Sequence, residues 1–136
     1  MYRRVLVVED EDVLRGLIVR NLKARGFEVQ EAASAEEALQ MLQNNLPDLM
    51  LLDINLPDRT GWDVLRELRR LGKSVPFIVI SAVRASQSLL GEFHPIAHLP
   101  KPFPLESLLR ILDGSLESAS AEPAGPGEQS DSRGEV

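Results

Sequence analysis

The sequence contains no cysteine, which excludes disulfide bonds and metal sites built on thiolates. It also has no apolar run that approaches the roughly 20 residues of a membrane-spanning helix. The apolar run near the N-terminus is short and interrupted by acidic residues, so it does not fit a secretory signal. The 136 residues suffice for one domain with a hydrophobic core, and we expect that domain in the cytoplasm, without a membrane partner.

The formal net charge of -6 is concentrated near the C-terminus. Five acidic residues and one arginine follow residue 113, so the preceding part carries only -2 and has no overall attraction to nucleic acid. From about Gly114 the sequence changes to Ser, Ala, Glu, Gly and Pro without hydrophobic periodicity. We therefore predict a folded domain over residues 1–117 and a disordered tail over residues 118–136.

Short apolar runs alternate with segments of helical periodicity up to residue 113. The apolar runs predict strands over residues 4–8, 27–31, 48–53, 76–81 and 96–99. Helical spacing and end signals predict a helix through Leu14, Ile18 and Leu22 to Gly26, one opened by Ser34 and Glu37, one from Trp62 to Leu71 before Gly72, and one from Pro104 to Leu112. This strict alternation predicts an α/β fold, with a parallel sheet covered by helices on both faces.

Residues 84–95 have the weakest pattern in this part of the sequence. Leu89 and Leu90 suggest a short helix, which Gly91 and Pro95 are expected to break. Because the segment shows no repeating apolar face, we expect it to be mobile.

The segment from Leu49 to Gly61 organises the rest of the sequence. An apolar run leads into the carboxylate of Asp53, and a turn rich in Asn, Pro and Asp follows at once. An ionised aspartate is almost never fully buried without partners. Asp53 should therefore lie at the carboxyl end of its strand, where open α/β sheets place their sites.

Three other predicted strands also end at polar residues. Glu9 and Asp10 follow the first strand, Ser81 ends the fourth, and Lys101 follows the fifth. Clustered carboxylates raise one another's pKa unless a cation is present, and oxygen ligands without His or Cys favour Mg²⁺. A carboxylate, Mg²⁺, a lysine and a hydroxyl are together suited to phosphoryl transfer, with the aspartate as nucleophile.

These motifs together resemble the response-regulator receiver domain of two-component signalling. The matching pieces are Val7–Glu11, Leu51–Asp58 with Gly61, Ile80–Ala82 and Lys101–Phe103, which occur in the family's order and cover about residues 1–113. The resemblance implies a flavodoxin-like, doubly wound sheet of five parallel strands in the order 2-1-3-4-5. It also implies a phosphoacceptor switch that catalyses only its own phosphorylation and dephosphorylation.

The resemblance further implies roles for the residues at the strand ends. Asp53 would be phosphorylated by a histidine kinase. Asp10, Asp53 and the backbone carbonyl of Asn55 would hold Mg²⁺, with Glu9 assisting directly or through water. Lys101 would pair with the phosphoryl group.

The switch and the kinase-docking surface also follow from the resemblance. Ser81 would bind the phosphoryl group and switch together with His98, which occupies the position of the family's switch aromatic. Val13 and Leu17, on the first helix, would receive the kinase. The sequence departs from the family between Ser81 and Lys101, where the spacing is about two residues shorter than usual, so the output surface is the least defined part.

Two other functions fit the sequence less well. A Mg²⁺-dependent aspartyl phosphohydrolase would need a second aspartate where Asn55 stands, and a nucleotide-binding module would need a Gly-rich loop where Glu9–Asp12 stands. Taken alone, the acidic run could be a solvated turn that caps a helix. The chain could be a stand-alone regulator, a phosphorelay intermediate or a receiver from a larger regulator. We expect no direct nucleic-acid binding by this chain and an unknown downstream protein partner.

Overall fold

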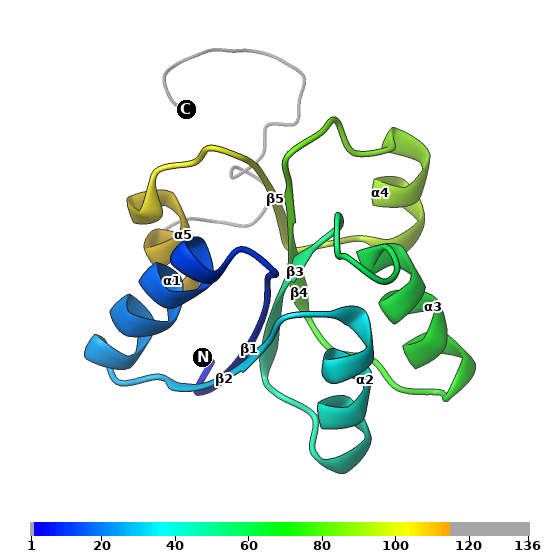
Figure 1. Ribbon diagram of the computed structural model, residues 1–136, viewed down its shortest axis with the longest axis horizontal. Coiled ribbons are helices and arrows are strands. Elements are labelled where there is room, and N and C mark those ends of the chain that lie inside the picture. Colours follow the sequence, from blue (N-terminus) through cyan, green and yellow to red (C-terminus); the bar gives the residue numbers. More distant parts are fainter. Residues whose placement is uncertain (1, 115–136) are drawn as a thin grey trace.

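The computed structural model describes residues 2–114, so the predicted domain end at residue 117 and the predicted tail at 118–136 lie outside the described residues. Within residues 2–114, five strands alternate with five helices (Figure 1). The strands are β1 (Arg4–Val8), β2 (Glu28–Ala32), β3 (Leu49–Asp53), β4 (Phe77–Ser81) and β5 (Ala97–Pro100). The helices are α1 (Asp12–Ala24), α2 (Ala35–Asn44), α3 (Gly61–Arg70), α4 (Gln87–Phe93) and α5 (Leu105–Leu112).

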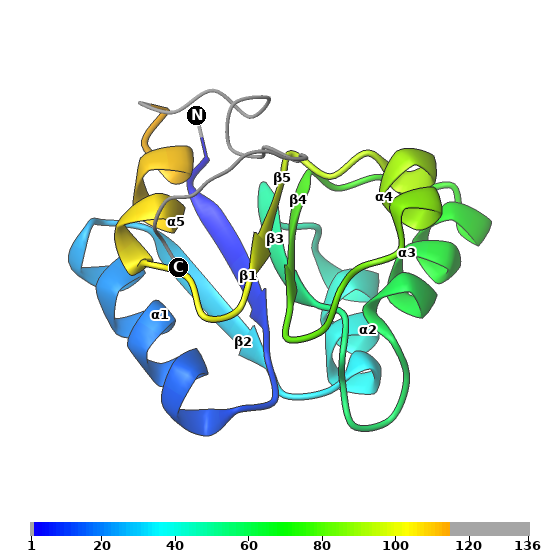
Figure 2. The same ribbon diagram turned by 90° about the horizontal axis from the view of Figure 1, so that it is seen from above.

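The strands form one parallel sheet in the order β2-β1-β3-β4-β5, which confirms the predicted fold. Helices α1 and α5 cover one face of the sheet, and α2, α3 and α4 cover the other (Figures 1 and 2). Because side chains alternate across a strand, the sheet supplies two separate cores. Leu6, Met50 and Leu52 belong to the core beneath α2, α3 and α4, whereas Val7 and Leu51 belong to the core beneath α1 and α5.

Several helix ends follow from the local sequence. Gly26 and Gly72 adopt positive φ angles of 94° and 71° just after α1 and α3, as expected of glycines that end helices. Ser34 caps α2 by accepting a hydrogen bond from the Glu37 N–H at 3.1 Å, and the Glu37 carboxylate accepts one from the Ala33 N–H at 2.8 Å. None of the helices that the structure describes is long and apolar enough to cross a membrane.

Helix α4 corrects the prediction for residues 84–95. Gly91 lies inside the helix rather than breaking it, and the helix ends at Phe93, just before the left-handed C-cap residue His94 (φ 56°) and Pro95. Leu89, Leu90 and Phe93 all pack against the core beneath α2 and α3. The segment therefore does have an apolar face, and the reason for expecting it to be mobile was wrong.

Smaller corrections concern element ends. Leu71 follows α3 as its C-terminal cap and is 42% exposed, so it does not extend the apolar face of that helix. Pro104 precedes α5 as its N-cap instead of lying in the first turn. Strands β2, β3, β4 and β5 each begin one residue later than predicted, and β2 and β5 also end one residue later. None of these shifts moves a predicted site residue away from its strand end.

An aromatic and ionic contact fastens α4 to α3. The rings of Trp62 and Phe93 stack with their centroids 5.8 Å apart, and the Arg69 guanidinium lies 4.3 Å from the Phe93 ring centroid. Arg69 also donates a hydrogen bond to Glu92 at 2.8 Å. Trp62 is buried, so its ring serves the packing of α3 against α4.

Candidate functional site at the carboxyl edge of the sheet

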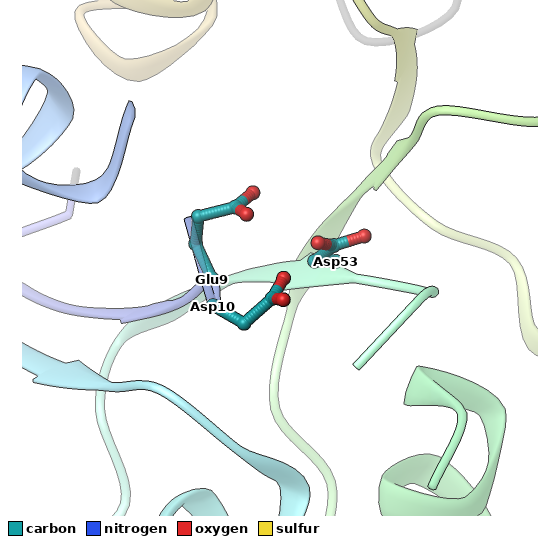
Figure 3. Close-up of side chains that lie close together, drawn as sticks. All are labelled: Glu9, Asp10 and Asp53. Atoms are coloured by element: carbon teal, nitrogen blue, oxygen red, sulfur yellow. The ribbon is translucent and has the colours of Figure 1, made fainter. Parts of the chain in front are cut away.

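The parallel sheet brings the predicted site residues to one edge. Glu9 and Asp10 directly follow β1, Asp53 is the last residue of β3, and Lys101 follows β5. Figure 3 shows Glu9 and Asp10 at the end of β1 beside Asp53 at the end of β3. One carboxylate oxygen from each of these three acids lies within 4.8 Å of the others. Acids separated by more than forty residues in the sequence thus form one cluster.

Asp53 is buried, with a side-chain exposure of 1%, and its two carboxylate oxygens have different partners. Oδ1 accepts a hydrogen bond from the Asn55 N–H at 2.9 Å, and Oδ2 accepts one from Lys101 Nζ at 3.3 Å. Burial raises the pKa of the Asp53 carboxyl, although the Asn55 N–H and Lys101 oppose the shift. The expectation that Asp53 ends a buried strand and has partners there is confirmed.

Glu9 is the most deeply buried acid of the cluster, with no exposed surface. Oε2 accepts hydrogen bonds from the Glu11 N–H at 3.0 Å and from Lys101 Nζ at 3.2 Å. Oε1 lies 3.0 Å from Lys101 Nζ but receives no hydrogen bond from any described residue. Burial, helped by the charge of Asp53, raises the pKa of Glu9 to about 7.

Lys101 provides the positive charge within the cluster. Its ammonium contacts both Glu9 and Asp53, and Glu11 lies at 3.8 Å. Burial alone would lower the pKa of Lys101, but the hydrogen bond to Glu9 and the charge of Asp53 raise it above its usual value. The backbone N–H of Lys101 donates to the Ser81 carbonyl at 2.7 Å, which ties the lysine to the end of β4.

The loop after Asp53 is held in place from two sides. The Gly61 N–H donates to the Ile54 carbonyl at 2.8 Å, and a side chain at Gly61 would place its Cβ 2.6 Å from the Asp53 carbonyl oxygen. On the other side, Asp58 accepts hydrogen bonds from the N–H groups of Ala35 and Glu36 at the start of α2, each at 2.9 Å. These backbone N–H groups hold the pKa of Asp58 below its usual value, although desolvation opposes them.

Ser81 is buried at the end of β4 and makes a contact that the sequence did not predict. Its hydroxyl oxygen lies 2.9 Å from Nε2 of His98, which stands on the neighbouring strand β5. His98 is half-buried, and burial lowers the pKa of its imidazole. The structure therefore brings together the two residues predicted to form the switch, but as hydrogen-bonded partners.

Arg15 is a second residue whose role the sequence did not predict. Its guanidinium donates to the Glu9 carbonyl at 2.8 Å, to Asp12 at 2.7 Å and to Glu31 at 3.0 Å. It thus links the start of α1 and the edge strand β2 to the acidic loop. Because Arg15 closely follows the acidic residues Glu9–Asp12, the sequence could have predicted a contact with them. The contact with Glu31 on β2 depends on the tertiary fold and could not be predicted from neighbouring residues.

The acidic run is not a helix-capping turn. Glu11 occupies the N-cap position of α1, and its side chain makes no capping hydrogen bond. Glu9 points instead into the buried cluster with Lys101. Along the next turn of α1, Val13 is 87% exposed and Leu17 is 39% exposed, whereas Ile18 and Leu22 face the core as predicted.

The cluster fits a hard divalent cation. Its ligands are carboxylate oxygens, as Mg²⁺ prefers. Oε1 of Glu9 is buried and receives no hydrogen bond from the described residues, and burial raises the pKa of both Glu9 and Asp53, so a bound cation would stabilise their ionised forms. Glu9, Asp10 and Asp53 are the residues that could hold the ion.

Comparison with known proteins identifies the class that this fold and site define. Residues 5–113 match the model of the response regulator receiver domain. The chain therefore belongs to the response-regulator receiver family of two-component signalling, whose members are signalling switches rather than conventional enzymes.

Individual relatives agree with this assignment. The chain is 35% identical over 121 residues to the response regulator MprA of Mycobacterium sp. strain KMS, an alignment that covers 88% of this chain and 53% of the relative. It is 44% identical over 116 residues to a probable transcriptional regulatory protein of Picosynechococcus sp., covering 78% of this chain and 46% of that protein. The chain thus spans about half the length of these relatives.

Two solved structures are similar over nearly their full length. The CheY-like receiver domain protein of Methanospirillum hungatei has a TM-score of 0.76 and 26% sequence identity, over 85% of this chain and 94% of that one. The response regulator TrrA of Thermotoga maritima, solved in complex with Mg²⁺ and BeF, has a TM-score of 0.72 and 31% identity, over 84% and 99% of the two chains.

Proposed function

We propose that this receiver is a phosphoacceptor switch, phosphorylated on Asp53 by a histidine kinase in a Mg²⁺-dependent reaction. The single observation that carries the proposal is the buried carboxylate of Asp53 at the end of β3, paired with Lys101 beside the acids that follow β1. A carboxylate oxygen of Asp53 attacks phosphorus, and the bond from phosphorus to the kinase histidine breaks, leaving its electron pair on the imidazole nitrogen.

Each remaining residue of the cluster has a role in this proposal. Asp10, Asp53 and the Asn55 carbonyl would hold Mg²⁺, with Glu9 assisting directly or through water, and the bound ion would neutralise charge between the acids and the incoming phosphoryl group. Lys101, already 3.3 Å from Asp53, pairs with the phosphoryl oxygens. The Ser81 hydroxyl donates a hydrogen bond to the phosphoryl group.

Acetyl phosphate supplies a test that needs no kinase. With Mg²⁺, the full chain should gain the mass of one phosphoryl group, acetate being the leaving group. Removing the metal with a chelator should abolish the gain, because the crowded carboxylates then repel the donor. Asp53→Asn, which keeps the side chain's shape, should remain unmodified. Equal modification of this variant would contradict the proposal.

The kinase should dock on the exposed apolar residues of α1 beside the acidic cluster. Val13 and Leu17 are exposed there, and burying exposed apolar surface against a partner favours binding. With a histidine kinase that phosphorylates the wild-type chain, Val13→Asp should slow transfer about tenfold, equivalent to about 1.4 kcal/mol. Phosphorylation by acetyl phosphate should be unchanged.

Leu71→Asp is the matched control for this docking surface. Leu71 is also an exposed apolar residue, but it lies at the C-terminal end of α3, whereas the start of that helix is near Asp53. Kinase transfer should be unaffected by this change. Equal slowing by both substitutions would show that the loss comes from adding a charge anywhere on the surface and not from docking on α1.

The lengths of the curated relatives favour one form of the proposal. The alignments cover only 53% and 46% of two of them, and one is named a probable transcriptional regulatory protein. A receiver that controls a further protein segment is therefore a second candidate beside a stand-alone regulator or relay intermediate. Phosphoryl transfer from this chain to a histidine-containing phosphotransfer protein would favour the relay.

A further inference from the structure

The contact between Ser81 and His98 joins the last residue of one strand to its neighbour. Val79 on β4 is aligned with His98 on β5, and Ser81 with Pro100, so the parallel ladder fixes both backbones. Ser81 is 1% exposed, and its hydroxyl oxygen lies 2.9 Å from His98 Nε2. A hydroxyl buried this deeply needs a hydrogen-bond partner, and this ring nitrogen supplies one.

The contact can run in either direction. A serine hydroxyl donates one hydrogen bond and accepts others, while a neutral imidazole has one N–H and one nitrogen that accepts. Burial lowers the pKa of His98, which favours the neutral ring and keeps a nitrogen able to accept. The contact with His98 is the only hydrogen bond that the Ser81 hydroxyl makes among the described residues, so donation to Nε2 gives the buried hydroxyl proton an acceptor.

A phosphoryl group on Asp53 would compete for that same proton. Its charged oxygens accept stronger hydrogen bonds than a neutral nitrogen does. Once Ser81 donates to the phosphoryl group, its oxygen offers only lone pairs to His98. Nε2 must then carry a proton to keep the contact, since two acceptors facing each other in a buried site are unfavourable.

We propose that His98 is a positioning residue for the Ser81 hydroxyl, and that the hydrogen bond between them reverses direction when Asp53 is phosphorylated. This inference rests on the proposed function of Asp53. In the unphosphorylated state Ser81 donates to Nε2, and in the phosphorylated state the Nε2–H donates to Ser81. The proton on Nδ1 passes to water while water supplies one to Nε2, so the ring keeps the same number of protons.

Nitrogen NMR of the imidazole ring tests the reversal directly. The chain has two histidines, and His94→Asn removes one signal while leaving a residue that tolerates the left-handed backbone there. The full chain is measured alone and with Mg²⁺ and beryllofluoride as the phosphoryl mimic, and fluorine NMR reports whether the mimic is bound. His98 Nε2 should be unprotonated alone and protonated with the mimic.

Ser81→Ala is the matched variant, because it removes the hydroxyl between the two groups and changes little volume. At concentrations where fluorine NMR shows bound mimic, His98 Nε2 should no longer change its protonation. Retention of the change in this variant would show that the signal reaches His98 by another route and would overturn the proposal.

Wild-type protein gives two further decisive outcomes. Nε2 in the same protonation state with and without bound mimic would overturn the reversal while leaving Asp53 phosphorylation intact. If no mimic binds, or if it binds equally to Asp53→Asn, the proposed function itself fails and the reversal fails with it. The fluorine signal therefore separates the two failures.

Discussion

Two glycines show how differently the same residue type can act in this fold. Gly61 starts α3 against the Asp53 backbone, where the methyl group of an alanine would meet the carbonyl oxygen at 2.6 Å. Gly16 lies inside α1 with no heavy atom within 4 Å of the same position. The first glycine is needed for close approach, whereas the second is merely a poor helix former.

Alanine substitutions at these glycines should therefore have opposite effects. Gly61→Ala should lower the free energy of unfolding by about 1–3 kcal/mol, as expected of overpacking. Gly16→Ala should raise it by about 0.5–1 kcal/mol, because alanine favours the helix. Urea denaturation of both variants measures this. A Gly61→Ala protein as stable as wild type would mean that the loop after Asp53 is less tightly constrained than these contacts indicate.

At the scale of elements, α4 is the piece whose attachment to the rest of the fold most needs a test. It contributes no fully buried residue, and Leu89, Leu90 and Phe93 are only partly buried against the core. Stacking of Phe93 on Trp62 and its contact with Arg69 fasten it to α3. Such contacts contribute modest free energies that together hold a short helix.

Phe93→Leu should loosen α4 while leaving the sheet intact. We expect the free energy of unfolding to fall by about 1–2 kcal/mol, from the lost aromatic and cation–π contacts. Amides of Gln87–Phe93 should exchange hydrogen faster. The fluorescence of Trp62, the chain's single tryptophan, should also change. Val83→Ala, on the exposed loop before α4, is the control and should alter neither signal.

The wild-type exchange rates decide between two descriptions of this segment. Protected amides in α4 would support the attachment to α3. Amides that already exchange freely without the substitution would contradict it and restore the expectation of a mobile segment.

The elements differ in how well the sequence predicted them, for a physical reason. Strands β1, β3 and β4 were clear because runs of buried apolar residues leave little ambiguity, and their polar ends located Glu9, Asp53 and Ser81. The prediction for helix α4 was wrong in expecting Gly91 to break the helix. A helix of seven residues is too short to show a repeating apolar pattern that would outweigh the helix-breaking tendency of Gly91.

Contacts between distant elements could not be predicted at all. The hydrogen bond from Ser81 to His98 depends on the register of β4 against β5, and the capping of α2 by Asp58 spans 23 residues. Neither is encoded by local propensity, since each needs the assembled sheet. The resemblance to receivers supplied roles for Ser81 and His98 but not this direct contact.

At the scale of the whole molecule, the buried acids couple stability to pH. Burial raises the pKa of Glu9 to about 7 from the usual value of 4.5. A carboxyl with a raised pKa binds its proton more tightly in the folded protein. Its contribution to stability is therefore fully present below pH 4.5 and is lost as the pH rises through about 7.

The comparison of wild type with Glu9→Gln should reveal this effect. From pH 4.5 to 7, the wild type should lose up to about 3 kcal/mol of unfolding free energy relative to the variant, and the difference should level off above that range.

Mg²⁺ should shrink this pH-dependent loss of stability, because a bound cation stabilises ionised carboxylates. Asp10→Ala should weaken this Mg²⁺ effect. Parallel pH profiles for wild type and Glu9→Gln would contradict the account of Glu9.

The central claim is that Asp53 receives the phosphoryl group, and chemical trapping tests it most directly. Borohydride reduces an aspartyl phosphate to homoserine with release of phosphate, so the modified residue is permanently marked. After treatment with acetyl phosphate and Mg²⁺, peptide mass spectrometry should find homoserine at position 53, and the mark should be absent when the metal is chelated. Homoserine at Asp10 or another aspartate, or none in protein that has gained a phosphoryl group, would contradict the account.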